Sequence, residues 1–173
     1  PAELMGGEPY IVIANIPYYI TSALMRHLLE SSLRPNRIVF TMQKEVAARI
    51  CENEGKSSLL SLSVQVYGEP RVVAKLPAGA FFPPPKVDSA TLRVDLFDEP
   101  RIPQEHMDTF FTLAKAGFSQ KRKNLRNSLS GGLHISKEEV EDLLGKAGID
   151  TSRRAETLSI DEWGRLTALY QNR

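Results

Sequence analysis

The first hundred residues alternate between short apolar runs and stretches whose apolar positions have helical spacing. Runs rich in β-branched residues are typical of buried strands, and they predict strands over 10–14, 37–42, 71–76 and 90–96. Helical spacing predicts a helix that starts at Thr21 or Ser22 as its N-cap and runs to Leu29. Further helices are predicted over 45–50 and over 59–67, where a strand is the alternative. This alternation predicts an α/β layer with a mainly parallel sheet.

The strand predicted over 10–14 lies close to the start of the chain, whose first residue is Pro1 rather than a methionine. A buried strand needs neighbouring strands, and too few residues precede this one to supply them. We therefore expect the chain to be a fragment of a longer protein.

The pattern changes over 98–103, where two prolines stand among charged residues. Such a segment is typical of a domain boundary or linker, and no strand pattern follows it. Apolar residues at helical spacing predict a helix that contains Met107 to Leu113. Two capping boxes predict further helix starts, one from Ser136 to Glu139 and one from Ser159 to Glu162. The second part is therefore predicted to be a small all-helical domain.

Composition excludes several classes of protein. Of 173 residues, 42% are hydrophobic and 25% are charged, as in an average globular domain, which excludes a disordered polymer or a disulfide scaffold. No apolar run approaches the roughly 20 residues that cross a bilayer, so no membrane association is expected. The single cysteine, Cys51, cannot form an internal disulfide and fits a reducing, cytoplasmic setting. The net charge is only +1, so any affinity for nucleic acid must come from local clustering.

The first candidate site is the tetrapeptide Asn15-Ile16-Pro17-Tyr18, which directly follows the first predicted strand. In open α/β sheets, ligands bind beyond the carboxyl ends of the strands. The side-chain carbonyl of Asn15 and a backbone carbonyl before or at the proline are two acceptors that could hold both hydrogens of an exocyclic amine. Tyr18 offers a face on which a flipped base could stack. The alternative is an ordinary strand-to-helix turn.

The second candidate site is the proline-rich segment Phe81–Ser89, with the sequence FFPPPKVDS. It predicts a rigid, extended loop that forms a wall for a planar ligand, with Lys86 near a phosphate or other negative charge. The alternative is a polyproline turn at the edge of a sheet. Each of the two segments suits the pocket of an amino-methyltransferase, so together they favour this chemistry over two ordinary turns.

A third candidate site is a basic segment with no acid, whose cations are Lys115, Lys121, Arg122, Lys123 and Arg126. Such a cluster is the electrostatic footprint of phosphate binding, and Phe118 could stack or pack beside it. A solvated helix face is the alternative. Arg153 and Arg154 either extend the cluster or pair locally, and the sequence does not decide between these possibilities.

These segments resemble the ribosomal RNA adenine dimethyltransferase family, in which the N-[IL]-P-Y and F-x-P-x-P-K-V-D-S loops are hallmarks. The resemblance continues through 118–129 and 154–159, which look more like the small-subunit enzymes than the antibiotic-resistance branch. It implies the C-terminal half of a Rossmann-like methyltransferase domain followed by a small all-α domain. We expect a partial catalytic domain over 1–98, on the target-adenine side, and a helical RNA-binding domain over 99–173.

The resemblance also implies roles for single residues. Asn15 and the Ile16–Pro17 backbone would hold the target amine. Tyr18 and Phe81 would sandwich the adenine, and Lys86 would support this pocket or touch the RNA backbone. The implied reaction is dimethylation of adenine amino groups in small-subunit (16S) ribosomal RNA during ribosome biogenesis. The implied partners are ribosomal RNA and the small ribosomal subunit, and the enzyme is expected to be monomeric.

In this family a glycine-rich loop binds the methyl donor, S-adenosylmethionine, and the chain contains no G-x-G-x-x-G sequence. Asn15 is then the one remaining residue expected near the donor. The chain alone is therefore predicted to be inactive, and its longer parent to be the enzyme. No metal is expected, because His27, His106 and His134 stand apart without partners at ligand spacing.

Two rival functions remain open. A resistance-type enzyme that methylates adenine in large-subunit RNA shares Asn15–Tyr18, so only its substrate or its C-terminal domain would separate it. A non-catalytic ribosome-assembly factor that binds RNA is the other rival. A DNA amino-methyltransferase is disfavoured by Phe81–Ser89 and by the C-terminal segment.

Overall fold

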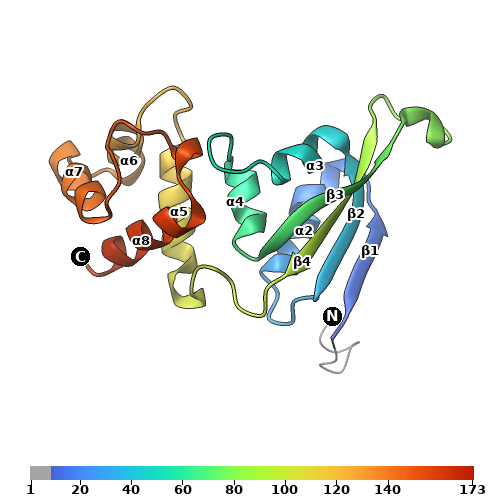
Figure 1. Ribbon diagram of the computed structural model, residues 1–173, viewed down its shortest axis with the longest axis horizontal. Coiled ribbons are helices and arrows are strands. Elements are labelled where there is room, and N and C mark those ends of the chain that lie inside the picture. Colours follow the sequence, from blue (N-terminus) through green and yellow to red (C-terminus); the bar gives the residue numbers. More distant parts are fainter. Residues whose placement is uncertain (1–8) are drawn as a thin grey trace. The chain divides into compact units, whose positions relative to one another are not determined.

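The computed structural model describes residues 9–173, which form two compact units (Figure 1). The first unit contains the described residues up to Cys51 together with Ser63–Glu99, and the second contains Glu52–Leu62 together with Pro100–Arg173. The segment 52–62, which the sequence pattern assigns to the first domain, therefore belongs with the second unit. Helix α4 (Leu59–Gln65) passes from one unit into the other.

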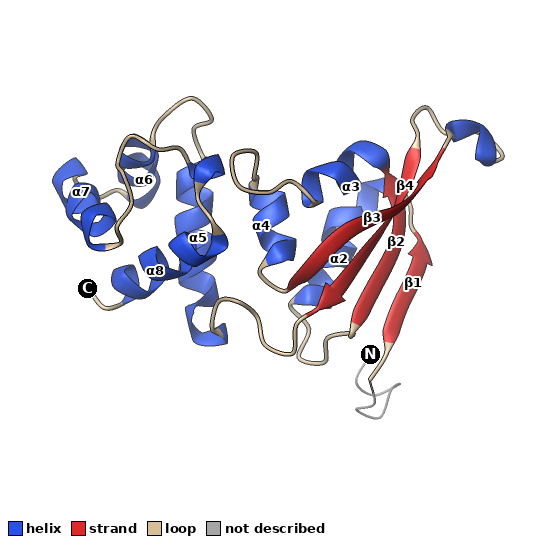
Figure 2. Cartoon of the chain, in the orientation of Figure 1, coloured by secondary structure: helices blue, strands red, loops and turns tan. Residues whose placement is uncertain are grey.

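The first unit contains a four-stranded sheet in the order β1-β2-β4-β3 (Figure 2). Its strands, all of which were predicted, are β1 (Ile11–Asn15), β2 (Arg37–Gln43), β3 (Gly68–Leu76) and β4 (Ser89–Leu96). β1 and β2 are parallel, whereas β4 pairs antiparallel with both β2 and β3. The expectation of a mainly parallel sheet was wrong, because β3 and β4 are joined directly by the loop 77–88. A connection without a crossover helix makes neighbouring strands antiparallel.

The two central strands have one packed face and one partly exposed face. Ile38, Phe40 and Leu92 are completely buried, whereas the residues between them along each strand are half-buried. Helix α3 (Lys44–Ile50) packs against β2, β3 and β4. Burial of such apolar side chains is the main source of stability for a layer of this kind. The helix predicted over 59–67, where a strand was the alternative, is confirmed by α4.

Strand β1 lies at an edge of the sheet, and its apolar side chains are only partly covered. The side chain of Ile11 is 55% exposed and that of Ile13 is 70% exposed. The prediction of a buried strand is therefore wrong for the described residues, in which β2 alone pairs with β1. A β-branched run indicates that a segment suits a sheet, but it does not show what covers the side chains.

The start of helix α2 (Thr21–Leu29) differs from the predicted cap. Ile20 is the N-cap residue, and no side chain accepts a hydrogen bond at this helix start. A 3₁₀ turn, η1 (Tyr18–Ile20), leads into the helix instead, so the prediction of a Thr21 or Ser22 cap was wrong. Thr21 is itself buried within the first turn of the helix.

The second unit is helical throughout its described residues. Its longer helices are α5 (Met107–Phe118), α6 (Leu125–Leu133), α7 (Lys137–Lys146) and α8 (Ile160–Gln171), with short 3₁₀ turns over Gln104–His106 and Ala155–Thr157. Both predicted capping boxes are confirmed, since the serine and the glutamate of each make the two reciprocal hydrogen bonds. No helix in the described part of the chain is long and apolar enough to cross a membrane.

Trp163, the one tryptophan of the chain, lies at the centre of the helical core. Its side chain is completely buried and its ring stacks on Phe118, with the ring centroids 6.2 Å apart. A Cβ atom at Gly117 would lie only 2.6 Å from the tryptophan ring. Glycine at this position therefore permits the close approach of α5 and α8.

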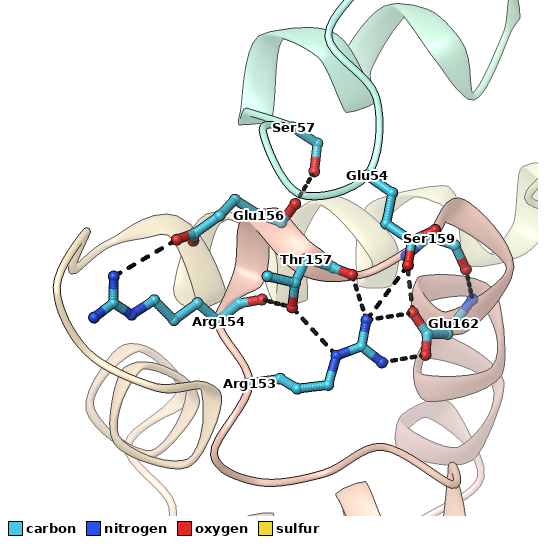
Figure 3. A network of polar contacts seen from close by, with 8 residues as sticks. All are labelled: Glu54, Ser57, Arg153, Arg154, Glu156, Thr157, Ser159 and Glu162. Carbon is cyan, nitrogen blue, oxygen red and sulfur yellow. Dashed lines mark hydrogen bonds and ion pairs between the residues drawn. The ribbon is translucent and has the colours of Figure 1, made fainter.

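A polar network fixes the chain that precedes α8 (Figure 3). The guanidinium of Arg153 donates two hydrogen bonds to the Glu162 carboxylate, at 2.5 and 3.1 Å, and one to the Thr157 carbonyl. The hydroxyl of Ser57 donates to the Glu156 carbonyl at 2.8 Å, and the Gly55 amide donates to the same oxygen. These bonds explain why the loop before α4 belongs with the helical unit.

Candidate functional site

The two candidate loops leave the sheet at the same end. Asn15, the last residue of β1, pairs with Thr41 near the end of the parallel strand β2. Ser89, the first residue of β4, pairs with Gln43, the last residue of β2, and with Leu76, the last residue of β3. The tetrapeptide after β1 and the loop between β3 and β4 are therefore neighbours in the fold, although residues 19–76 separate them in the sequence.

In the tetrapeptide, buried and exposed residues alternate in a way that presents polar groups outward. Ile16 is buried and anchors the loop, whereas Asn15 and Pro17 are exposed. The Pro17 carbonyl accepts a hydrogen bond from the Ile20 amide at 3.2 Å. The sequence offered two backbone carbonyls as the second acceptor, and the Pro17 carbonyl already accepts this hydrogen bond. The Ile16 carbonyl is therefore favoured as the acceptor that would act together with the Asn15 side chain.

Tyr18 connects the tetrapeptide to the second loop. Its hydroxyl lies 2.7 Å from the hydroxyl of Ser89, within hydrogen-bonding distance. Ser89 is completely buried, whereas Tyr18 is half-buried and keeps part of its ring exposed. The aromatic residue of one motif is therefore tethered to the last residue of the other.

The proline-rich loop is fastened at its C-terminal end by Asp88. One carboxylate oxygen of Asp88 accepts from the Ala78 amide at 3.2 Å, and the other lies 3.4 Å from the Lys44 ammonium. The Asp88 carbonyl also accepts from the Lys44 amide at 3.0 Å. Phe81 is half-buried and Lys86 is exposed, so both remain accessible to a ligand at this end of the sheet.

This arrangement can bind a planar ring that carries an amino group. The side-chain carbonyl of Asn15 and the backbone carbonyl of Ile16 are hydrogen-bond acceptors at the carboxyl end of a strand. Tyr18 carries a half-buried aromatic ring at this end of the sheet, and Phe81 carries another in the loop between β3 and β4. An amine whose two hydrogens are held by acceptors keeps its lone pair free for attack on an electrophile.

The basic segment falls on two elements of the second unit. Lys115 is exposed on α5, and Lys121, Arg122 and Lys123 are all exposed in the turn between α5 and α6. Arg126, in the first turn of α6, lies 2.5 Å from the carboxylate of Glu141. Its charge is therefore partly neutralised by an acid that is distant in the sequence.

The two arginines whose role the sequence left open pair within their own unit. Arg153 is held by Glu162, with Glu54 3.7 Å away. Arg154 is about half-exposed and lies 3.9 Å from Glu156, at the limit of an ion pair. Local pairing is thus what the structure shows for both.

Comparison with known proteins identifies the family. A family profile described as "Ribosomal RNA adenine dimethylase" matches residues 3–172. The chain belongs to this family. The match extends over both candidate loops and the basic segment, so the resemblance inferred from these motifs is confirmed.

Curated relatives agree with this assignment. "Ribosomal RNA small subunit methyltransferase A" of Dehalococcoides mccartyi is 47% identical over 171 residues, which are 98% of this chain and 59% of the relative. The protein of the same name from Alkaliphilus metalliredigens is 40% identical over 169 residues, which are 96% of this chain and 59% of that relative. The chain thus spans about 59% of the length of these relatives.

Solved structures confirm the α/β fold and its helical extension. The 23S rRNA methyltransferase ErmE matches with a TM-score of 0.70 and 26% identity, over 95% of this chain and 66% of that one. A dimethyladenosine transferase from Plasmodium falciparum matches with a TM-score of 0.76 and 23% identity, over 94% of this chain and 67% of that one. At this identity the second match carries information on the fold alone.

Three contacts at the candidate sites could not be found from the sequence. They are the contacts of Ser89 with Tyr18, of Asp88 with Lys44 and of Glu141 with Arg126. The sequence analysis gave no role to Ser89 or Asp88, and Glu141 lies outside the basic segment. The partners do not stand at a spacing that marks them as neighbours, and Tyr18 and Ser89 are 71 positions apart in the sequence. One local signal was available, since a serine and an aspartate at the start of a strand commonly make hydrogen bonds that fix a turn.

Proposed function

We propose that this chain carries the target-adenine site and the RNA-binding unit of an enzyme that dimethylates adenine amino groups in small-subunit ribosomal RNA. The observation that carries the proposal is the meeting of the two hallmark loops at one end of the sheet, joined by the Tyr18–Ser89 hydrogen bond. The names of the curated relatives support the choice of substrate. The reaction would take place in the cytoplasm, on small subunits under assembly.

In this proposal the acceptors hold the amine and the rings hold the base. The Asn15 side-chain carbonyl and the Ile16 carbonyl accept one hydrogen each from the adenine amino group. The lone pair of the nitrogen then points away from the acceptors. Tyr18 and Phe81 stack on the two faces of the flipped adenine, and Lys86 supports this pocket or contacts a nearby phosphate. No general base is required, because the amine attacks while neutral and loses its proton to water afterwards.

S-adenosylmethionine, the donor implied by the family, supplies an electrophilic methyl group. We propose that the described residues supply only a small part of its site, since no glycine-rich turn follows any of the four described strands. Asn15 is the residue of this chain that we place beside the donor. We propose that the remaining donor contacts come from residues outside this chain, and that the chain alone transfers no methyl group.

Methyl transfer with a labelled methyl group tests the proposal. The longer protein that contains this chain is offered unmethylated small subunits and naked large-subunit RNA in parallel, and the RNA is digested to nucleosides. We expect labelled dimethyladenosine from the small subunits only, and none from this chain alone. Label only in large-subunit RNA would favour the resistance-type function, and no label in either would contradict methyl transfer.

The exposed cations of the turn between α5 and α6 are proposed to contact RNA phosphates. Each phosphate contact steepens the plot of log affinity against log salt by about 0.7 to 0.9. Replacement of Lys121, Arg122 and Lys123 by alanine should therefore flatten the slope by about 2 to 3. Filter binding of small-subunit RNA between about 50 and 200 mM salt measures this slope.

The matched control removes the same net charge elsewhere on the helical unit, by alanine at Lys137, Lys146 and Arg165. This control should leave the slope nearly unchanged. Equal slopes for the two triple variants would mean that overall charge, rather than the turn, binds the RNA. Arg126→Ala should have a smaller effect than a change in the turn, because Glu141 already neutralises Arg126.

A further inference from the structure

We propose that Ser89 is a positioning residue that fixes the ring of Tyr18 and thereby sets the slot between Tyr18 and Phe81. This inference rests on the proposed function, in which the two rings enclose the target adenine. Ser89 touches neither base nor donor in this scheme. It acts through the hydroxyl of Tyr18, which lies 2.7 Å from its own.

Ser89 is held in place from both sides. It begins β4, and its backbone pairs with Gln43 of β2 and with Leu76 of β3. Its side chain is completely buried. A group with a fixed backbone and no exposed surface has little freedom to move, so it is a suitable anchor for a more mobile partner.

Tyr18 needs such an anchor. It begins the 3₁₀ turn η1, where the N-cap residue Pro17 makes no side-chain hydrogen bond to the turn. Pro17 is exposed, and Tyr19, which follows Tyr18, is 88% exposed. None of the three residues of the turn is buried. A hydrogen bond at the far end of the phenol ring restricts both side-chain torsions of Tyr18 at once.

The identity of residue 89 is explained by this contact. Buried hydroxyls are nearly always hydrogen-bonded, because an unpaired one loses its bonds to water without replacement. At the start of a packed strand, alanine would fill nearly the same space without a polar group. The hydroxyl of Ser89 is satisfied by Tyr18, so the contact accounts for a serine at this position.

The same residue belongs to the loop that carries Phe81. Asp88, its neighbour, ties the end of that loop to Lys44 and to the loop's own start at Ala78. The Tyr18–Ser89 bond therefore joins the two loops whose aromatic residues are proposed to enclose the adenine. A displacement of one ring of about 1 Å would misplace the bound amine, and errors of this size can cost about a hundredfold in rate.

The test compares Ser89→Ala, Tyr18→Phe and the double variant in the longer protein that contains this chain. Both single changes remove the same hydrogen bond. Ser89→Ala deletes the buried hydroxyl, and Tyr18→Phe deletes the hydroxyl of the ring. We expect each to lower kcat/KM for unmethylated small subunits about tenfold, and the double variant to fall no further than either single variant. The KM for S-adenosylmethionine should stay unchanged in all three.

Ser61→Ala is the matched control, since it also removes a buried serine hydroxyl, one that donates to the Ser58 carbonyl at the start of α4. It should leave kcat/KM unchanged. If Ser89→Ala fails to fold, Tyr18→Phe carries the test, because it removes the bond from outside the core. Wild-type kinetics in Tyr18→Phe, or effects that multiply in the double variant, would overturn the inference alone. An inactive wild-type protein would overturn the proposed function and this inference with it.

Discussion

Replacement of Asn15 by alanine should lower methyl transfer by two orders of magnitude or more and leave RNA binding intact. The side chain is proposed to accept a hydrogen bond from the target amine, and removal of one such group from a preorganised site typically costs about 10²- to 10³-fold in rate. Asn15 is exposed at the end of β1, so its truncation should not disturb the fold. The measurement is kcat/KM with unmethylated small subunits, together with the Kd for the same RNA.

Asn53→Ala, in the loop before α4, is the matched control and should retain the wild-type rate. Tyr18→Ala extends the test to the second rival function. Methyl transfer should fall by orders of magnitude in this variant, whereas an RNA-binding assembly role should survive it. Unchanged methyl transfer in both Asn15→Ala and Tyr18→Ala would mean that the tetrapeptide is an ordinary strand-to-helix turn.

Local patterns predicted the elements of this fold well, since they depend on neighbours in the chain. The four strands follow from β-branched runs, and the starts of α7 and α8 follow from capping boxes whose two partners stand three residues apart. The N-cap of α2 was missed because a 3₁₀ turn, which has no strong sequence signature, precedes that helix.

Pairing between distant segments was not predictable in the same way. The antiparallel direction of β4 depends on which strand it meets, and the exposure of Ile11 and Ile13 depends on what lies beside β1. At the candidate sites, the tetrapeptide and the proline-rich loop were recognised as motifs. Their meeting through Ser89, and the neutralisation of Arg126 by Glu141, required the fold. Sequence therefore identified the segments that form the candidate sites, but not the contacts between them.

The ion pair at the start of α8 should make the helical unit sensitive to acid. Burial raises the pKa of the Glu162 carboxyl, but hydrogen bonds from the Arg153 side chain and the Ser159 amide outweigh burial and lower its pKa below the usual value. A carboxyl whose pKa is lower in the folded state stabilises the fold at pH values above its unfolded pKa of about 4.3. This stabilisation is lost as the pH falls through the lower, folded-state pKa.

Glu162→Gln separates the effect of the carboxylate charge from that of the capping hydrogen bond, because glutamine also completes a capping box. The side chains of Arg153 and Glu162 are only 28% and 15% exposed. The variant therefore removes the nearer counter-charge of a partly buried guanidinium and leaves the more exposed Glu54, 3.7 Å away. At pH 7 we expect it to lower the free energy of unfolding by about 2 kcal/mol, less than for a fully buried pair. The difference from the wild type should shrink below about pH 4. Urea unfolding followed by Trp163 fluorescence, at several pH values, measures both.

The second capping box offers a matched control in the same unit. Glu139 occupies the equivalent position in α7 and pairs with Arg173 at 2.9 Å, but both side chains are more exposed, at 49% and 35%. Water already screens that pair, so Glu139→Gln should change stability little at any pH. If the two variants lose the same stability, the cost comes from the capping position rather than from the Arg153 pair. A pH-independent loss in Glu162→Gln would likewise contradict an ion pair that stabilises the turn before α8.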